Sequence, residues 1–395
     1  MIETDFLIIG VGIIGLSIAK ELLVKYPDMS IRVIEKEGDV ARHASGRNSG
    51  VLHAGFYYSK DSLKAKFSKE GNALMKEYCR QNSLSLNENK KVVVAQNELE
   101  LERLMDLQKR AEINGVETKV IDEYELEKIE PYAKTFQKAL YSPTTATIDP
   151  TQVISRLKSE LQKAGVKFHF NEAYETYSGN NVVRTKYNQF EAGKIINAAG
   201  LYADKIAKEF GLSKNYTILP FKGIYLEYTK PHKIKTNIYP VPNPKNPFLG
   251  VHYTVTSTGK LKIGPTAIPA LWREHYKGME GFNAKETANI LAWQSRLYLS
   301  NSFGFRSLAH EEIKKYKIAH MQHLATALTQ NFDTSHFSKW GKAGIRAQLL
   351  DRRTLELVQD FVVEQKEGSV HILNAVSPAF TASFAFAKWV VDNYI

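Results

Sequence analysis

Three glycines near the start of the chain have the spacing of a phosphate-binding turn. Gly10, Gly12 and Gly15 follow an apolar run, and Glu35 closes the next β-branched run 20 residues later. The first glycine allows a tight turn, the second lets backbone N–H groups approach a pyrophosphate, and the third lets a helix pack closely on the strand. The acid is placed to accept hydrogen bonds from an adenosine ribose. The spacing predicts a bound dinucleotide, either NAD or FAD.

A second segment with ligand-binding chemistry, residues 43–58, follows directly. Its small residues and hydrogen-bonding side chains, without an aliphatic period, are typical of a loop that wraps a ligand. A flavoprotein can use such a loop, because the loop crosses the pyrophosphate and ends beside the isoalloxazine ring. A nicotinamide dehydrogenase need not place a loop of this kind here. The segment favours FAD.

Motifs along the whole chain resemble the D-amino-acid oxidase superfamily of FAD oxidoreductases. Within it, the chain is most similar to the L-2-hydroxyglutarate dehydrogenase/oxidase group. The motifs lie, in chain order, at residues 47–58, 62–65, 197–200, 248–252, 264–265, 272–276, 343–348 and 374–381. Two places depart from the group: Phe380 stands where a small residue is usual, and residues 310–340 carry no matching motif.

The resemblance implies which residues hold FAD, at several places in the chain. The glycine turn and the 43–58 loop contact the pyrophosphate, and a helix N-terminus at residues 377–381 faces the flavin pyrimidine edge, where reduced flavin carries negative charge. The residues expected to bind the cofactor are Gly10, Gly12, Ile13, Ile14, Gly15, Glu35, Lys36, Ser45, Arg47, Asn48, Ser49, Gly50, Val51, His53, Ala199, Gly200, Arg346, Ser377, Pro378, Ala379 and Thr381.

Two histidines are candidates for the base of a hydroxy-acid oxidation. In that reaction a hydride leaves for flavin N5 while the hydroxyl proton goes to a base, and histidine titrates in the suitable range. His53 follows the wrapping loop, and His252 lies in the expected substrate sheet. Either can be the base, and the other would then hydrogen-bond the substrate or the flavin.

A dicarboxylate substrate calls for cationic partners, and arginine forms bidentate pairs with carboxylates. Arg346, in a glycine-bounded turn, is the first candidate, and Arg273 is the second, with Tyr276 as its hydroxyl partner. Lys222 is expected to lie over the flavin or to reach the substrate.

The pattern of elements that must position these residues changes twice along the chain. Residues 1–80 indicate strand, helix, strand, loop and a helix at 62–81; helices are also expected at 99–114, 151–163, 202–210, 284–298, 313–328 and 381–394. From residue 216 strands rich in Tyr, Thr and Val alternate with Pro/Asn/Gly turns, notably at 240–247, which indicates an antiparallel sheet. The last residues return to the first pattern.

We therefore expect a mixed α/β and α+β fold: a Rossmann-like FAD-binding domain with an inserted antiparallel-sheet substrate domain. The FAD-binding domain is assigned residues 1–80, 141–215 and 340–395. The substrate-binding domain is assigned residues 81–140 and 216–339.

The composition excludes several other kinds of site. Cys79 is the only cysteine, so an internal disulfide or a CxxC redox pair is impossible. His310, His320 and His323 lack the HExxH pattern, so no metal site is expected. Lysine and arginine exceed the acids by 11, but the basic residues are dispersed, which argues against a nucleic-acid partner.

The predicted activity is FAD-dependent oxidation of a 2-hydroxy acid to a 2-keto acid, with L-2-hydroxyglutarate as the expected substrate. Electrons would pass to a membrane quinone or another acceptor, oxygen included. The alternatives are a glycine- or sarcosine-like amine oxidase and a basic flavoprotein that binds RNA or a partner. The chain opens without a signal peptide, so a cytoplasmic location is expected, with peripheral contact at the inner face of the cell membrane.

Overall fold

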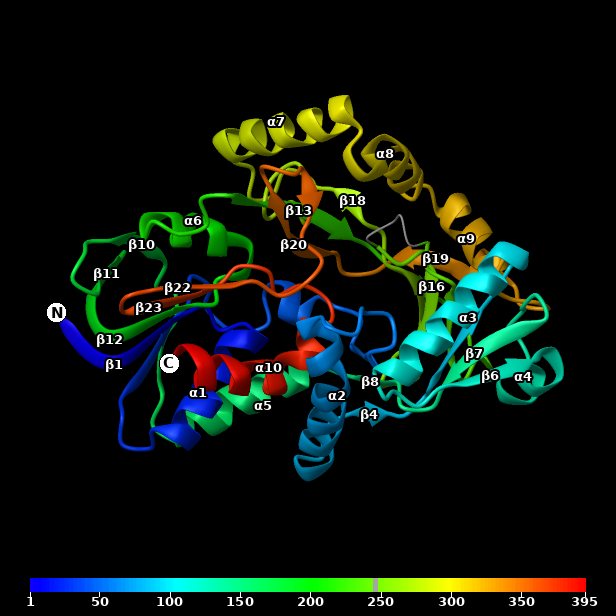
Figure 1. The fold of residues 1–395 in the computed structure, drawn as a ribbon, viewed down its shortest axis with the longest axis horizontal. Coiled ribbons are helices and arrows are strands. Elements are labelled where there is room, and N and C mark those ends of the chain that lie inside the picture. The colour runs from blue at the N-terminus through cyan, green and yellow to red at the C-terminus, as the bar shows by residue number, and fades with distance from the viewer. Residues whose placement is uncertain (244–247) are drawn as a thin grey trace.

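The glycine turn follows β1, an inner strand of an eight-stranded sheet (Figure 1). The computed structural model describes residues 1–243 and 248–395. The strand order is β10-β11-β12-β1-β2-β9, with β23 beside the last residues of β12 and β22 beside β23. The strands are β1 (Ile2–Ile9), β2 (Ile31–Ile34), β9 (Lys167–His169), β10 (Tyr174–Tyr177), β11 (Val182–Thr185), β12 (Gln189–Asn197), β22 (Val363–Lys366) and β23 (Ser369–Ile372).

Helices cover both faces of this sheet because consecutive residues of its central strand β1 are apolar, so that both faces of the strand must be buried. Ile8 of β1 packs with one group of helices, whereas Leu7 and Ile9 pack with Ile206 on the opposite face. The first group is α1 (Ile13–Lys25), α5 (Pro150–Lys163) and α10 (Ala379–Tyr394), with α2 (Leu63–Gln81) against α10; the other face carries α6 (Ala203–Glu209). Elements from the two ends of the chain thus pack on one sheet.

A second eight-stranded sheet forms the other half of the molecule, on the right in Figure 1. Its order is β19-β14-β17-β16-β15-β5-β7-β6, and all its pairs are antiparallel except β15 with β5. The strands are β5 (Lys91–Val94), β6 (Lys119–Asp122), β7 (Lys138–Ser142), β14 (Leu226–Tyr228), β15 (Asn237–Pro240), β16 (His252–Val255), β17 (Leu261–Gly264) and β19 (Phe337–Trp340). The helices α3 (Glu98–Ile113), α4 (Glu123–Ile129) and α9 (Ile318–Thr326) accompany it.

Two smaller sheets complete the fold. The first has the order β18-β13-β20-β21, formed by β13 (Tyr216–Gly223), β18 (Ile268–Pro269), β20 (Gly344–Asp351) and β21 (Glu356–Leu357). The apolar side chains of α7 (Ala284–Ser300) and α8 (Phe305–Lys314) pack on this four-stranded sheet. The second joins β3 (Val51–Leu52), β8 (Ala146–Ile148) and β4 (Leu86–Asn87).

The expected mixture of a Rossmann-like unit and an antiparallel sheet is confirmed, with two differences in detail. Strand β20 pairs with β13, and β21 pairs with β20, so residues 344–351 and 356–357 belong to the four-stranded sheet rather than to the nucleotide-binding sheet. The helix expected at 313–328 is two helices, because α8 ends at Lys314, where Lys315 turns back to pair with the buried Glu312, and α9 begins at Ile318. Of the expected 240–247 turn, residues 244–247 lie outside the described part of the chain.

Among the described residues, no helix combines the length and the apolar character needed to cross a bilayer.

Candidate active site

A large cavity lies between the two units and brings the sequence motifs together. It is lined by the β1–α1 turn, the loop after β2, residues of β20, the loop before α10, and side chains of the second sheet. Its volume of about 1880 Å³ exceeds the roughly 300–1,000 Å³ of an ordinary ligand pocket. The cavity therefore has room for a dinucleotide together with a second small molecule.

The glycine turn is shaped for close approach of a ligand. Gly10 has a φ of 105°, and a Cβ there would lie 2.8 Å from the carbonyl oxygen of Ala198, so the turn requires glycine. One carboxylate oxygen of Glu35 accepts the N–H of Val11 at 3.1 Å, and the other accepts the N–H of Glu37 at 3.0 Å. Each oxygen keeps a further lone pair for a ligand hydroxyl.

The loop after β2 folds over the start of α1. Ser45 Oγ accepts the N–H of Ile13 at 3.0 Å. Asn48 fixes the loop from within, because its Oδ1 accepts the N–H of Gly50 at 2.8 Å and its Nδ2 donates to the carbonyl of Ser45 at 2.8 Å. The loop therefore presents a fixed polar surface to the cavity.

Two helix N-termini open on the cavity, and both favour an anion. The first turns of α1 and α10 line it, and the N-caps, Gly12 and Pro378, supply no side-chain cap. The N–H groups of Ile13 and Ala379 are accepted by Ser45 and Val376, and the N–H groups that follow them, with the helix dipoles, face the ligand. All the residues expected to hold the cofactor line the cavity except Gly15 and Gly50, which lie behind it. This arrangement fits a flavin dinucleotide, with its pyrophosphate at α1 and its ring at α10.

His252 has the geometry of a neutral proton acceptor. Its Nδ1 lies 2.9 Å from the Gly250 carbonyl, an interaction that requires Nδ1 to carry the proton and leaves Nε2 as an acceptor. Burial lowers the pKa of His252 to about 3, assisted by the positive charges of Lys91, Arg346 and Lys262. The ring lines the cavity and is 4% exposed. His252 is thus held unprotonated with its lone pair free.

His53 lines the same cavity and lies close enough to His252 for each charge to act on the other. Its backbone N–H donates to Thr381 Oγ1 at 3.1 Å, which ties it to the first turn of α10. Burial, with the charges of Lys91 and His252, holds the pKa of His53 well below its usual range. Its Nδ1 is buried and has no hydrogen-bond partner among the described residues, so it is available to a ligand.

Arg346 brings a positive charge to the cavity without a carboxylate to neutralise it. Its Nη1 donates to the carbonyl of Thr266 at 2.9 Å, and no ion pair with a described acid is formed. Glu312, the acid whose charge acts on Arg346, is paired with Lys315. A partly buried guanidinium that lacks a counter-ion favours an anionic ligand.

Lys222 is not at the site, contrary to expectation. It directly precedes the cavity-lining Gly223 in β13, and its own side chain does not line the cavity. Its charge acts instead on His275. Because neighbouring residues of a strand point to opposite faces, a lysine beside a lining glycine is directed away.

Arg273 is also placed elsewhere, in a buried ion pair. Its Nη1 lies 2.7 Å and its Nη2 3.0 Å from the two carboxylate oxygens of Asp204, and Nη1 also donates to the Leu201 carbonyl. Both side chains are buried, and neither lines the cavity. The bidentate pair joins α6 to the segment before α7 and holds the guanidinium away from the cavity, so the expectation that Arg273 binds a substrate carboxylate is corrected.

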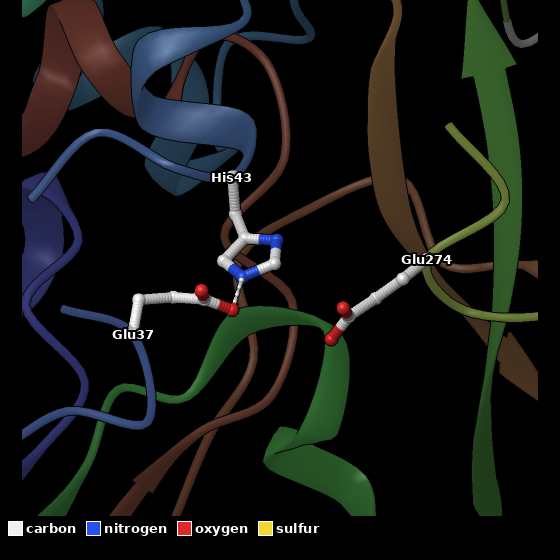
Figure 2. A group of neighbouring side chains, drawn as sticks. All are labelled: Glu37, His43 and Glu274. Carbon is white, nitrogen blue, oxygen red and sulfur yellow. Dashed lines mark hydrogen bonds and ion pairs between the residues drawn. The ribbon is translucent and has the colours of Figure 1, made fainter. Parts of the chain in front are cut away.

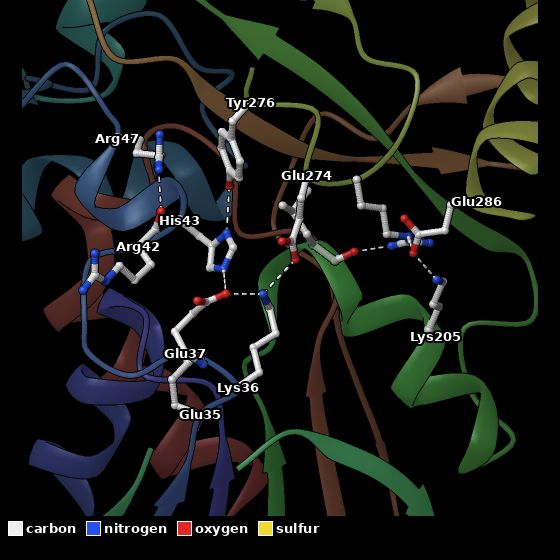
Figure 3. A network of polar contacts seen from close by, with 12 residues as sticks. Glu35, Lys36, Glu37, Arg42, His43, Arg47, Lys205, Glu274, Tyr276 and Glu286 are labelled. Atoms are coloured by element: carbon white, nitrogen blue, oxygen red, sulfur yellow. Dashed lines mark hydrogen bonds and ion pairs between the residues drawn. The ribbon is translucent and has the colours of Figure 1, made fainter. Parts of the chain in front are cut away.

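Tyr276 belongs to a polar network that connects the loop after β2 with residues 274–276 (Figure 3). Its hydroxyl lies 2.8 Å from His43 Nδ1, and Arg47 stacks on its ring at 4.3 Å. Tyr276 does not line the cavity, so the expectation that it contacts the substrate is corrected. Its contacts with His43 and Arg47 instead hold the loop after β2 in place.

One group of three potential metal ligands occurs among the described residues, in the same network. Glu37, His43 and Glu274 point toward one another (Figure 2), with His43 Nε2 2.9 Å from Glu37 Oε1. The ammonium of Lys36 pairs with Glu37 and lies 2.8 Å from Glu274. Because the ammonium of this lysine already pairs with both acids, we assign no metal to the group.

An aromatic wall with a lysine behind it was not predicted from the sequence. Tyr57, Tyr58, Tyr225 and Tyr239 line the cavity beside the histidines, and the ammonium of Lys91 lies 4.1 Å from the Tyr239 ring centre. Tyr57 and Tyr58 ended the wrapping loop, but nothing in their spacing indicated a role. For Lys91 the only signal was a charge at the start of the apolar run 92–95.

Comparison with known proteins gives consistent similarities over the whole chain. The family model described as FAD dependent oxidoreductase (DAO) matches residues 5–393. The mitochondrial L-2-hydroxyglutarate dehydrogenase of Bos taurus is 36% identical over 416 residues, which cover 98% of this chain and 88% of that protein. The L-2-hydroxyglutarate dehydrogenase of Escherichia coli (strain K12) is 34% identical over 398 residues, 98% of this chain and 92% of that protein.

Solved structures show the same fold at low sequence identity. The FAD-bound, dithionite-reduced L-α-glycerophosphate oxidase of Mycoplasma pneumoniae superposes with a TM-score of 0.77 at 21% identity, over 100% of this chain and 96% of that chain. Glycine oxidase from Geobacillus kaustophilus superposes with a TM-score of 0.75 at 18% identity, over 99% of this chain and 94% of that chain.

Proposed function

This chain belongs to the DAO family of FAD-dependent oxidoreductases, and on that premise we propose that it oxidises L-2-hydroxyglutarate to 2-oxoglutarate. The observation that carries the proposal is the uncompensated guanidinium of Arg346 in one cavity with the free Nε2 of His252. A cation for a carboxylate and a base for a hydroxyl proton are what a 2-hydroxy acid requires. The 34–36% identity to L-2-hydroxyglutarate dehydrogenases over nearly the full chain supports this substrate.

FAD, when bound, supplies the acceptor for the hydride that leaves C2 of the substrate. We propose that the pyrophosphate is held by the β1–α1 turn and Ser45, the ribose by Glu35, and the flavin pyrimidine edge by residues 377–381. The lining positions of these residues and the open N-termini of α1 and α10 support this arrangement.

His252 is proposed as the base. Its protonated Nδ1 is engaged by Gly250, so the hydroxyl proton of the substrate goes to Nε2. A base is most effective when its pKa is near the working pH. A bound dicarboxylate adds negative charge beside His252, and this raises the pKa of His252 from its value of about 3 in the ligand-free protein. Substrate binding therefore activates the base.

Arg346 is proposed to bind a substrate carboxylate, and His53 to donate or accept a hydrogen bond at the ligand through its unpartnered Nδ1. A guanidinium can form two parallel hydrogen bonds to a carboxylate, which orients C2 as well as neutralising charge. Orientation is required because the hydride and the proton leave from adjacent atoms.

For the electron acceptor, we propose a membrane quinone reached through peripheral contact with anionic lipid. The excess of 11 positive charges supports such a contact, since basic proteins are attracted to negative surfaces. Cosedimentation with anionic vesicles that is lost at high salt would support it. Absence of binding at low salt would contradict it.

The activity is tested with purified holoenzyme, an artificial electron acceptor and a panel of 2-hydroxy acids and amino acids. Formation of 2-oxoglutarate from L-2-hydroxyglutarate, in a one-to-one ratio with reduced acceptor, is expected. Turnover of glycine or sarcosine without turnover of any hydroxy acid would contradict the proposal.

A further inference from the structure

Lys91 is a fully buried lysine without a hydrogen-bond partner. It begins β5, its exposed fraction is 0%, and its Nζ contacts no donor or acceptor among the described residues. Aromatic faces surround it instead: its Nζ lies 4.1 Å from the ring centre of Tyr239 and 5.1 Å from that of Tyr57. A buried, unpaired ammonium is costly, so its retention at this place requires an explanation.

The strand register places Lys91 on the other side of Tyr239 from His252. β15 lies between β5 and β16, and Tyr239 of β15 is directly opposite His252 of β16, because Ile238 pairs with Tyr253. The rings of Tyr239 and His252 are stacked with centres 3.7 Å apart and an angle of 21°. Since the imidazole covers one face of the phenol ring, the ammonium occupies the other, as in a cation–π contact.

Among the described residues, the fixed charges that act on His252 are positive. Lys91 of β5, Lys262 of β17 and Arg346 of β20 face it, and His53 from the loop after β3 is the other titratable group nearby. Lys262 donates to the Ser49 carbonyl, and Arg346 lines the cavity. Lys91 has no hydrogen-bond partner among the described residues and does not line the cavity. The Tyr239 ring lies between Lys91 and the imidazole.

We propose that Lys91 is a positioning residue for the oxidation, acting through the Tyr239 ring to keep His252 unprotonated until substrate binds. The inference rests on the proposed function, in which His252 is the base. The ammonium adds positive potential at the imidazole, which disfavours imidazolium and leaves Nε2 free. The negative charge of the dicarboxylate then offsets this potential, so the base gains proton affinity at the moment of use.

The charge of Lys91 is itself present only on the acidic side of neutrality. Burial lowers the pKa of Lys91 to about 7. Its effect on His252 is therefore expected below about pH 7 and should fade above about pH 8. This window separates an electrostatic role from a packing role, which would not follow the protonation of one amine.

The test compares the wild-type holoenzyme with Lys91→Met, a neutral side chain of similar length. The two distances to the Tyr239 ring centre put the ammonium at most about 8 Å from the centre of the imidazole. At the intermediate dielectric of a protein interior, one charge at that distance changes a pKa by about 1 unit. NMR titration of labelled histidines, with His252 assigned from His252→Gln, should show the imidazole protonating at higher pH in Lys91→Met. The fall of kcat/KM on the acidic side of its pH profile should likewise occur at a higher pH in Lys91→Met.

Lys138→Met, on the exposed side of the neighbouring strand β7, removes the same charge without facing Tyr239 and should leave both readouts unchanged. Lys91→Arg should restore the wild-type limb, and Lys91→Gln replaces Lys91→Met if the latter does not fold. An unchanged His252 titration in both neutral variants would overturn the inference. The NMR titration needs no turnover, so it still tests the role of Lys91 if the protein fails to oxidise L-2-hydroxyglutarate. If the variants oxidise L-2-hydroxyglutarate but the pKa of His252 is unchanged, the role of Lys91 is contradicted and the proposed function is not.

Discussion

The imidazole of His252 and the phenol ring of Tyr239 lie face to face, with centres 3.7 Å apart and planes 21° from parallel. This stack, together with the 2.9 Å contact between Nδ1 and the Gly250 carbonyl, fixes both the orientation of the imidazole and the position of its proton. An enzyme that must take a proton from a substrate hydroxyl needs such a fixed lone pair. Tyr239 and His252 come from the neighbouring strands β15 and β16 of the second sheet, and both line the cavity.

Replacement of this base should slow the chemistry and spare the cofactor. His252→Gln keeps a side chain that can hydrogen-bond but cannot accept the proton, so the rate of flavin reduction should fall by about 10²- to 10⁴-fold. Rapid-mixing absorbance measures that rate, and the flavin spectrum of the purified variant reports FAD content. A variant with full FAD and a wild-type rate would remove His252 from the reaction.

Loss of the cavity guanidinium should affect substrate affinity. In Arg346→Gln, a substrate carboxylate loses its charged partner, a change that costs about 2 kcal/mol or more. KM for L-2-hydroxyglutarate should then rise at least about 30-fold, while bound FAD is retained. Arg184→Gln, at an exposed position of β11, is the matched control and should behave as wild type. Unchanged KM in Arg346→Gln would show that this guanidinium does not bind substrate.

The pair of Arg273 and Asp204 should act on stability rather than on substrate binding. Arg273→Met leaves the carboxylate of Asp204 buried without its partner, which typically costs about 3–5 kcal/mol of unfolding free energy. Denaturant unfolding measures this loss, and the double variant with Asp204→Asn should recover part of it. KM per folded enzyme should stay near the wild-type value, in contrast to Arg346→Gln; a large rise would return Arg273 to the site.

The pH dependence of stability should contain a term from His371. Burial lowers the pKa of His371 to about 4, and its Nε2 has no described partner, so the folded protein resists protonation there. The unfolded chain takes up that proton below about pH 6.5, and stability therefore falls as pH drops from about 6.5 to 4, by about 3 kcal/mol. His371→Gln cannot titrate, so its stability should decline less steeply over this range. Parallel curves for the two proteins would contradict the assignment.

Cofactor retention should depend on Gly10. A methyl group there meets the Ala198 carbonyl at 2.8 Å, and the backbone has a positive φ that alanine disfavours. Gly10→Ala should fold with little FAD, as seen in the ratio of flavin to protein absorbance after purification. Gly211→Ala, which also has a positive φ but lies outside the cavity lining, controls for backbone strain. Full FAD occupancy in Gly10→Ala would contradict the placement of the pyrophosphate.

The nucleotide-binding unit was largely predictable, because its signals are local. The Gly10–Gly15 turn, the acid Glu35 and the apolar runs around them are each explained by short-range backbone geometry. The placement of Arg273 and Lys222 was not predictable in this way. Which face of β13 a lysine takes depends on the register with β20, and the partner of Arg273 is 69 residues away in the sequence.

Lys91 illustrates the same limit within the site itself. In the sequence it reads as the polar start of a strand, and only the pairing of β5, β15 and β16 brings it behind Tyr239. Strand pairings between residues about 150 positions apart are set by the whole fold, so no local pattern reveals them. The histidines were recognised because the motifs around them are continuous; the lysine that acts on them was not.

Anaerobic reduction of the bound FAD with the two enantiomers of 2-hydroxyglutarate tests whether this protein oxidises L-2-hydroxyglutarate. We expect rapid loss of the oxidised flavin absorbance with the L enantiomer, a much slower change with the D enantiomer, and 2-oxoglutarate formed in equal amount to the FAD. Rapid reduction by glycine or sarcosine, with neither enantiomer active, would contradict it.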